Sequence, residues 1–232
     1  VIIGAVLFIA LLGLRGLCEP DEGRYAEIAR EMVEKGDYLE PRLNYIKHFH
    51  KPPLAYWLVA GSFLLFGMNE FTARLPVAGL AIGGLIITFF LAISMGRDRR
   101  CALLTSLVLA TSFQYFIWSQ VLAADMIFSF FIYLALFGFW SWYRGKGRPL
   151  PSGHKNFMPG GQGIYIFYAA LAFAFMVKGP VAVIIPFLII VFYAGFTGEW
   201  SLFKRIKLLP GAVLFFILVT PWFIYVCSKN PG

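Results

Sequence analysis

Two carboxylates lie at the borders of apolar segments, a placement suited to acid–base chemistry. Asp21 follows the first apolar segment, and Asp125 is the only acidic residue between Asp98 and Glu199. A carboxylate held beside apolar surface can have a raised pKa and act as a base. The alternative is that each acid merely favours the N-terminus of a helix. The pattern makes Asp21 and Asp125 candidate catalytic residues.

Two lysines share a second pattern. Lys51 precedes Pro52-Pro53, Lys178 precedes Gly179-Pro180, and an apolar segment follows each motif. Proline suits the start of a helix, so each lysine is expected beside the free N–H groups of a helix N-terminus. A cation together with such groups is suited to binding an anion, and phosphate in particular. The alternative, a lysine that extends to the membrane surface, is weaker for Lys178, which lies between two apolar segments.

His48 and His50 are separated by one residue and have carboxylates nearby in the sequence. Two histidines can take part in a metal site, but a zinc site needs further ligands at suitable positions. The pattern is a weak indication of a divalent metal, and we expect no required cofactor.

The composition indicates which elements position these residues. Hydrophobic residues make up 59% of the 232 residues and charged residues 14%, and the mean hydropathy is +0.75. These values exclude a disordered chain and a disulfide-stapled secreted module. The net charge of +8 does not indicate nucleic-acid binding, because the basic residues form short runs between apolar segments, as in membrane proteins. The composition predicts an all-α membrane protein with several spans.

Three basic runs define the predicted topology. They lie at 97–100, 144–155 and 197–207 and hold 10 of the 20 Lys and Arg residues. The positive-inside rule assigns these runs to the cytoplasm, so the loop 18–72, Asp125 and Lys178 are expected on the periplasmic side. We predict one transmembrane domain, with a first span at 1–17, the loop at 18–72, and about six further spans over 73–228. These further segments are 73–95, 101–118, 124–143, 163–178, 181–196 and 208–228.

The loop 18–72 contains nine of the twelve acidic residues and is patterned. Tyr25, Ile28, Ala29 and Met32 follow helical spacing, which predicts an amphipathic helix lying on the membrane surface. The apolar segment 54–67 is short for a span and predicts a second interfacial or re-entrant helix.

The chain begins within an apolar segment, without the basic start of a signal peptide. It ends shortly after another apolar segment. We expect it to be a fragment of a longer protein, beginning inside the first span.

Several motifs resemble one enzyme family. Three lie in or next to the long loop: EPDEGRYAEI at 19–28, KPPL at 51–54 and NEFTARLP at 69–76. They are similar to the first loop of bacterial aminoarabinose (ArnT-like) and protein-O-mannosyltransferase-like glycosyltransferases. Asp125 and Lys178-Gly179-Pro180 resemble later signatures of the same family. The resemblance implies the GT-C fold, a polytopic bundle with interfacial helices, and transfer of a sugar from a polyprenyl-phosphate carrier.

The resemblance also implies roles for the residues singled out above. The catalytic residues would be Asp21 and Asp125. The donor phosphate would be bound by Arg24, Lys51 and Lys178. The site would be shaped by Glu22, Tyr25 and His50. Many relatives have an acidic residue where this chain has His50, so a metal or acceptor role at that position does not carry over.

The function expected is that of an inner-membrane glycosyltransferase. It would move a sugar from polyprenyl phosphate to a periplasmic lipid A-type glycolipid or protein, by direct displacement without a required metal. The alternative is a multi-pass transporter or flippase of a lipid-linked substrate, with Asp125 and Lys178 on the pathway. Transporters often contain internal repeats, and the sequence shows none. A non-catalytic membrane subunit would leave both lysine–proline motifs without a purpose.

Overall fold

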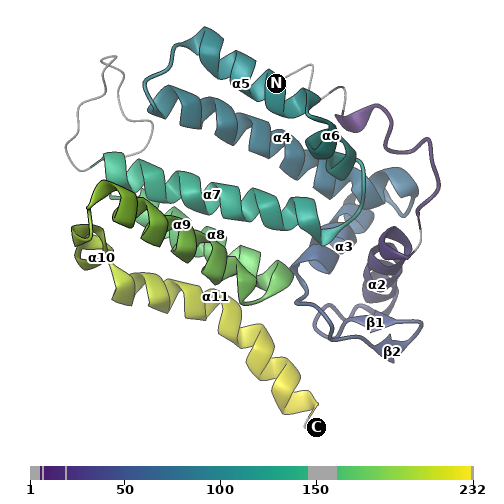
Figure 1. Ribbon diagram of the computed structural model, residues 1–232. Helices are drawn as coiled ribbons and strands as arrows, with labels where there is room; N and C mark the ends of the chain where they lie inside the picture. The colour runs from purple at the N-terminus through teal and green to yellow at the C-terminus, as the bar shows by residue number, and fades with distance from the viewer. Residues whose placement is uncertain (1–5, 7, 19, 146–160, 231–232) are drawn as a thin grey trace.

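The computed structural model describes residues 6, 8–18, 20–145 and 161–230, which form a helical bundle with one short hairpin (Figure 1). The predicted all-α membrane fold is confirmed. Strands β1 (Arg42–Leu43) and β2 (Ile46–Lys47) pair antiparallel. The described helices are α2 (Asp21–Lys35), α3 (Leu54–Phe66), α4 (Glu70–Ser94), α5 (Arg99–Thr111), α6 (Phe113–Ser119), α7 (Ala124–Arg144), α8 (Gly163–Lys178), α9 (Val181–Thr197), α10 (Ser201–Arg205) and α11 (Leu208–Lys229).

Three of the described helices, α4, α7 and α11, are long and apolar enough to cross a membrane. Helices α8 and α9 are apolar but have only 16 and 17 residues, fewer than the roughly 20 that a straight span needs. The predicted span 1–17 lies partly outside the described residues. Helices α8 and α9, both predicted as spans, are therefore shorter than α4, α7 and α11.

The predicted continuous helix over 101–118 is interrupted. Helices α5 and α6 meet at an angle of 68°, and Ser112 between them is extended, with φ −66° and ψ 129°. The hydroxyls of Thr111 and Ser112 donate hydrogen bonds to carbonyls of the preceding turn. Such side-chain bonds compete with helical backbone pairing and favour a bend. The bend redirects α6 toward the start of α7.

A pair of glycines fixes α7 against α8. A Cβ atom at Gly138 would lie 2.8 Å from the carbonyl oxygen of Gly163, and one at Gly163 would lie 2.5 Å from that of Gly138. Small residues at such a crossing let two helix backbones approach closely. Because α7 and α8 run in opposite directions (Figure 1), the first turn of α7 and the last turn of α8 lie at the same end of the bundle. Asp125 and Lys178 are on these two turns.

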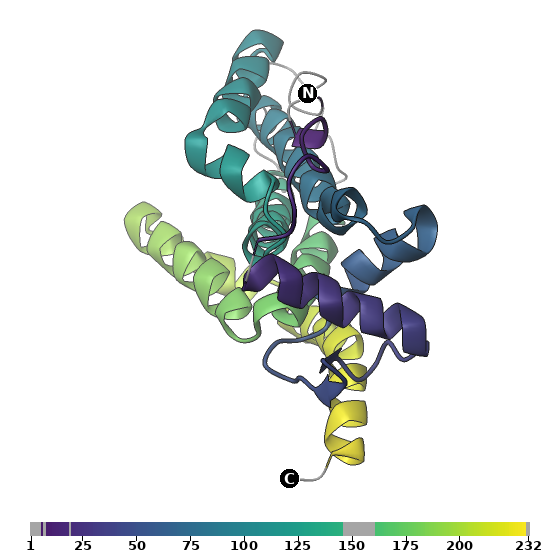
Figure 2. The same ribbon diagram turned by 90° about the vertical axis from the view of Figure 1, so that its right-hand side faces the viewer.

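The two ends of the bundle differ as the basic runs predict. The start of α5, with Arg99 and Arg100, and helix α10 lie at one end, and α2 with the hairpin lies at the other (Figure 1). Figure 2 faces the second end and shows α2 lying across it. The basic run at 144–155 falls mostly outside the described residues. The elements that carry Asp21, Lys51, Asp125 and Lys178 all meet at the α2 end.

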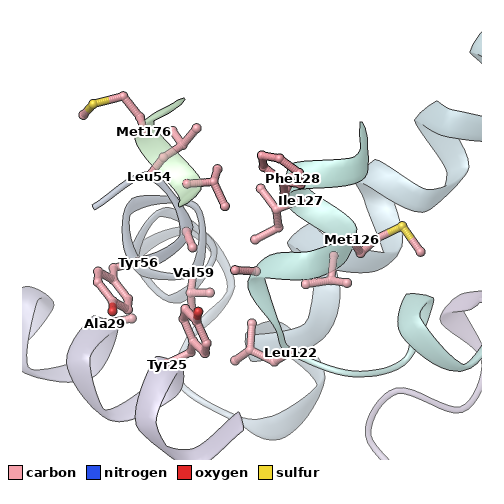
Figure 3. Close-up of a cluster of buried hydrophobic side chains, with 14 of the residues drawn as sticks. Tyr25, Ala29, Leu54, Tyr56, Val59, Leu122, Met126, Ile127, Phe128 and Met176 are labelled. Carbon is pink, nitrogen blue, oxygen red and sulfur yellow. The ribbon is translucent and has the colours of Figure 1, made fainter. Parts of the chain in front are cut away.

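The apolar stripe of α2 packs on protein. Tyr25, Ile28, Ala29 and Met32 are each at most 2% exposed. Figure 3 shows Tyr25 and Ala29 beside Tyr56 and Val59 of α3, with Leu122 close by. The prediction of a helix over this segment is confirmed, but its stripe faces α3 instead of the membrane. An exposed apolar surface is found instead at the end of α3, where Leu64, Leu65 and Phe66 are 59–77% exposed.

The hairpin was not predicted. Its turn residues Asn44 and Tyr45 have φ of 52° and 66°, a left-handed conformation that asparagine adopts readily and tyrosine rarely. Buried Glu31 of α2 accepts the backbone N–H of Tyr45 at 3.0 Å, so tertiary contact holds the turn. The indole of Trp222 in α11 donates to the carbonyl of Leu39 at 3.0 Å. The hairpin segment thereby joins α2 to α11.

Candidate functional site

Lys51 and Tyr25 form the first part of the candidate site. Lys51 Nζ donates to the Tyr25 hydroxyl at 2.9 Å and lies 5.4 Å from the centre of its ring. Burial raises the pKa of Tyr25 to about 12, so the phenol is neutral at physiological pH. The side chain of Lys51 therefore has a neutral partner, which does not offset its charge.

Lys178 and Asp125 form the second part. Lys178 Nζ lies 2.6 Å from Asp125 Oδ1 and 5.3 Å from the ring centre of Phe128. Positive-φ Gly179 ends α8 directly after the lysine, and Pro180 begins α9, as the motif predicted. The two side chains are 28% and 49% exposed, so an incoming ligand can reach this ion pair.

Tyr25 connects these two parts. Its hydroxyl bonds Lys51, and the backbone of Ala124, the residue before Asp125, is close enough to act on the pKa of the phenol. Three segments that are distant in sequence, at 25, 51 and 124–125, thus meet around one phenol. The nearby Asp125 carboxylate is among the groups that raise the pKa of this phenol.

Asp21 and Arg24 pair with each other on the first turns of α2. The carboxylate side chain of Asp21 is 59% exposed and that of Arg24 is 33% exposed. The N-terminus of α2 favours an ionised carboxylate through its dipole. Asp21 is thus a negatively charged, accessible group held in place by a neighbouring guanidinium.

His48 and His50 stack, with ring centres 4.4 Å apart. Burial lowers the pKa of His48, and the charges of His50, Arg24 and Lys51 lower it further. This part of the site is therefore basic. Within the ranges that the structure describes, no group of three or more His, Cys, Asp or Glu side chains is arranged to hold a metal ion.

Arg74 was not predicted from the sequence as a site residue, although this side chain is central to the structure. Its side chain is fully buried within α4. Its guanidinium donates to both carboxylate oxygens of Glu22 at 2.8 Å, and to the carbonyls of Leu12, Arg15 and Gly16. A cation within a predicted span needs a partner, and this signal could have identified Arg74.

Glu22 is buried next to the site and holds two backbone segments together. It is 1% exposed and also accepts the backbone N–H groups of Cys18 and Leu122, both at 2.8 Å. Burial by itself would raise the pKa of Glu22, but the hydrogen bonds from Arg74, Cys18 and Leu122 together lower it to about 2. The ionised Glu22 thus fastens α2 to the segment that leads into Asp125.

The fold therefore brings most of the proposed site residues together. They form three neighbouring pairs that place cations, accessible carboxylates and a neutral phenol at one end of the bundle. The pairs are Asp21–Arg24, Tyr25–Lys51 and Asp125–Lys178, with His50 against His48 on the basic side. Glu22 lies in the buried layer with Arg74. Such an arrangement can bind a phosphate and offer a carboxylate to a hydroxyl group.

Known proteins are similar to this chain in sequence and architecture. The chain is 33% identical over 185 residues to the undecaprenyl phosphate-alpha-4-amino-4-deoxy-L-arabinose arabinosyl transferase of Shewanella sediminis, covering 79% of this chain and 33% of that protein. It is 30% identical to the protein of the same name from Aeromonas hydrophila, covering 97% of this chain and 40% of the relative. The chain thus spans less than half the length of these relatives.

A solved structure extends the comparison to the fold. The crystal structure of ArnT from Cupriavidus metallidurans bound to undecaprenyl phosphate matches with a TM-score of 0.89 and 29% identity, over 100% of this chain and 41% of that chain. The family described as dolichyl-phosphate-mannose-protein mannosyltransferase matches residues 1–231. Because this match covers almost the whole chain, the protein belongs to the dolichyl-phosphate-mannose-protein mannosyltransferase family.

Proposed function

We propose that the whole protein is an inner-membrane glycosyltransferase that uses a polyprenyl-phosphate sugar as donor and a periplasmic lipid A-type glycolipid or protein as acceptor. One observation carries the proposal: Lys51, Tyr25, Asp125 and Lys178 converge from four segments at one end of the bundle. Their cations suit the phosphate of the donor. Two relatives are named for a donor built on undecaprenyl phosphate, and a related ArnT was crystallised with that lipid.

The proposed reaction is a single displacement at the anomeric carbon of the sugar. The acceptor oxygen forms a bond to this carbon while the bond from the carbon to the phosphate oxygen breaks. The phosphate leaves with the electron pair, and Asp21 takes the proton of the acceptor hydroxyl. Lys51, Lys178 and Arg24 stabilise the negative charge that develops on the phosphate. Asp125 is the second catalytic carboxylate, oriented by Lys178.

The acceptor needs a route to Asp21. A cavity of about 690 Å³ lies along α2, with Pro20, Gly23 and Arg24 in its wall. Asp21 itself does not line the cavity, but its ion-pair partner Arg24 does. Phe63 and Met68 give the same cavity an apolar wall, so we place the acceptor here. This wall suits an amphipathic molecule such as a glycolipid.

The direct test is a transfer assay with the full-length protein in proteoliposomes. The donors are radiolabelled undecaprenyl phosphate carrying 4-amino-4-deoxy-L-arabinose or mannose, and the acceptors are lipid A and a Ser/Thr-rich peptide. We expect label to move to one acceptor class. The absence of transfer from either donor to either acceptor would contradict the proposal.

The role of Asp21 has its own test. Asp21→Asn keeps the shape of the side chain but removes the group that takes the proton, so turnover should fall at least about a hundredfold, the lower range of a lost general base. Glu34→Gln is the matched control, because Glu34 is also an ion-paired acid of α2 and does not line the acceptor cavity. Near-normal turnover of Asp21→Asn would reduce Asp21 to a helix-terminal acid.

A further inference from the structure

A separate cavity lies at the end of the bundle opposite the candidate site. It has a volume of about 330 Å³ and is lined by α4, α7 and α9, with α7 running between the other two (Figure 1). Met95 at the end of α4 and Tyr143 in the last turn of α7 are part of its wall. Met95 and Ile189 of α9 are 48% and 44% exposed, so the cavity opens on the side of the bundle.

The wall of this cavity offers a ligand apolar surface. Leu91, Leu136 and Ile190 contribute aliphatic side chains. The polar groups of the aromatic side chains in the wall are already hydrogen-bonded within the protein. The pairs are Trp140 with Ser94 at 3.0 Å, Tyr143 with Glu199 at 2.7 Å, Tyr193 with Tyr143 at 3.2 Å and Tyr133 with Thr88 at 3.1 Å. The cavity therefore suits a hydrocarbon chain better than a polar ligand.

A cation without an acidic partner lies beside the cavity. Arg144 ends α7, and its guanidinium carbon is 5.2 Å from the ring centre of Trp140. Its Nε atom is buried without a hydrogen-bond partner, and no ion pair within the described part of the chain includes Arg144. Arg97, two residues after Met95, adds an exposed positive charge at the same end. A charge that no carboxylate offsets attracts an anion.

We propose that this cavity binds an anionic phospholipid of the membrane, with one acyl chain between α4, α7 and α9 and the phosphate at Arg144. The inference is independent of the proposed transfer reaction. Basic residues between apolar helices are suited to anionic head groups on the side where the positive-inside rule predicts the cytoplasm. The rings of Trp140 and Tyr143 are typical of the head-group depth. The cavity volume of about 330 Å³ is within the range of small-molecule sites.

The unpaired charge of Arg144 favours this occupant over others. A further apolar helix of the full-length protein, packed over the cavity, would bury that charge without an anion, which is costly. An uncharged lipid would fill the cavity but leave the same charge unmatched. The phosphate of a polyprenyl carrier is expected at the other end of the bundle, beside Lys51 and Lys178.

The test measures equilibrium lipid binding to the full-length protein in detergent. The ligands are phosphatidylglycerol and phosphatidylcholine with the same acyl chains, which differ in the charge of the head group, and undecaprenyl phosphate as a third ligand. Arg144→Gln removes the cation, and Arg144→Lys keeps it. Arg100→Gln is the matched control, because Arg100 is exposed on α5, on the far side of α4 from α7 (Figure 1).

A second pair of variants tests the position of the acyl chain. Ile189→Trp places a larger side chain in the cavity. Leu188→Trp is the matched control, because Leu188 and Ile189 are neighbours on α9 and are both 44% exposed, but Leu188 does not line the cavity. Since both substitutions are made at exposed positions, this pair remains informative if Arg144→Gln fails to fold.

We expect the wild type to bind phosphatidylglycerol about tenfold more tightly than phosphatidylcholine, the gain from one charge-assisted hydrogen bond. Arg144→Gln should abolish this difference, and Arg144→Lys should keep part of it. Arg100→Gln should change it less than about twofold, because exposed charges at a distance are screened. Ile189→Trp should weaken binding of both phospholipids at least about fivefold, and Leu188→Trp should leave both unchanged.

Four results would overturn the inference. Equal affinity of the wild type for the two phospholipids would exclude recognition of an anionic head group. Equal losses in Arg144→Gln and Arg100→Gln would reduce the effect to general charge. Unchanged binding in Ile189→Trp would place the acyl chain elsewhere or show that another part of the protein covers the cavity. If Ile189→Trp weakens binding of undecaprenyl phosphate more than that of phosphatidylglycerol, the cavity belongs to the polyprenyl carrier instead.

Discussion

The two lysine–proline motifs look alike in the sequence but have different partners in the fold. Lys51 donates to a neutral phenol at 2.9 Å, whereas Lys178 lies 2.6 Å from the carboxylate of Asp125. The pattern of a lysine before a proline places a cation near a helix start in both cases. The difference shows that the tertiary partner decides whether the charge of that cation is available to a ligand.

The charges around each lysine increase this difference in how available the two cations are to a ligand. The charges of Arg24, His50 and Lys51 all act on His48, so the Lys51 side of the site is basic. An anion that reaches Lys51 displaces at most one neutral hydrogen bond. An anion that reaches Lys178 must compete with Asp125. We therefore expect Lys51 to contribute more than Lys178 to phosphate binding.

The largest effect on stability is expected from removing the buried ion pair between Arg74 and Glu22. Arg74→Met leaves the Glu22 carboxylate buried without its guanidinium, which costs about 3–5 kcal/mol. Glu22 anchors Leu122, so the Asp125–Lys178 pair should be perturbed more than Lys51–Tyr25. Thermal unfolding in detergent measures this loss. Arg30→Met is the control, because Arg30 is part-exposed in its ion pairs and should cost at most about 1 kcal/mol. Equal losses would contradict a special role for Arg74.

The next effect separates the two lysines directly. Lys51→Ala should weaken binding of undecaprenyl phosphate about tenfold to hundredfold, because it removes a charge-assisted hydrogen bond of roughly 1.5–3 kcal/mol. Equilibrium binding to the full-length protein is the measurement. Lys47→Ala is the control, since Lys47 pairs with Glu40 and Asn230 instead. Wild-type affinity in Lys51→Ala would remove Lys51 from the phosphate site.

A smaller effect is expected at Lys178. Lys178→Ala should weaken the same binding by less than about tenfold, because Asp125 already offsets its charge. Asp125→Asn should strengthen binding of bare undecaprenyl phosphate by a few-fold while transfer is lost. If Lys178→Ala weakens binding more than Lys51→Ala does, the comparison between the two lysines is reversed.

The smallest effect concerns pH and the buried layer. The pKa of Glu22 is lowered from 4.5 to about 2, so its ionised form stabilises the fold above pH 4.5. This contribution declines as the pH falls from 4.5 toward 2, because the unfolded chain then binds the proton more strongly. The melting temperature of the wild type should fall in this range. Glu22→Gln should be less stable at neutral pH and show a weaker fall. Parallel curves for the two proteins would argue against this role of Glu22.

Much of the fold follows from local patterns. The helical spacing of Tyr25, Ile28, Ala29 and Met32 predicted α2, and the short apolar segment after Pro53 predicted α3. The basic runs correctly separated the end with Arg99 and Arg100 from the end with α2. Periodicity and charge distribution are properties of single segments, so they can be read without knowing what each segment packs against.

The bend and the hairpin could not be predicted in this way. The segment 101–118 contains no charged residue, glycine or proline, and the break at Ser112 depends on two hydroxyls that bond the preceding turn. The hairpin turn at Asn44 and Tyr45 depends on Glu31, 14 residues away in the sequence. Neither signal is a periodic pattern.

The sequence by itself determined most of the helices, the two ends of the bundle and the residue types available for chemistry. Only the tertiary structure decided how those residues pair. The contacts that distinguish the sites join residues 26 positions apart for Lys51 and Tyr25, 53 for Lys178 and Asp125, and 52 for Arg74 and Glu22. Several acids and phenols were possible partners for each cation. The packing of α2, α3, α4, α7 and α8 decides which of them it contacts. Local spacing cannot predict these pairings, because they form only when distant segments are buried together.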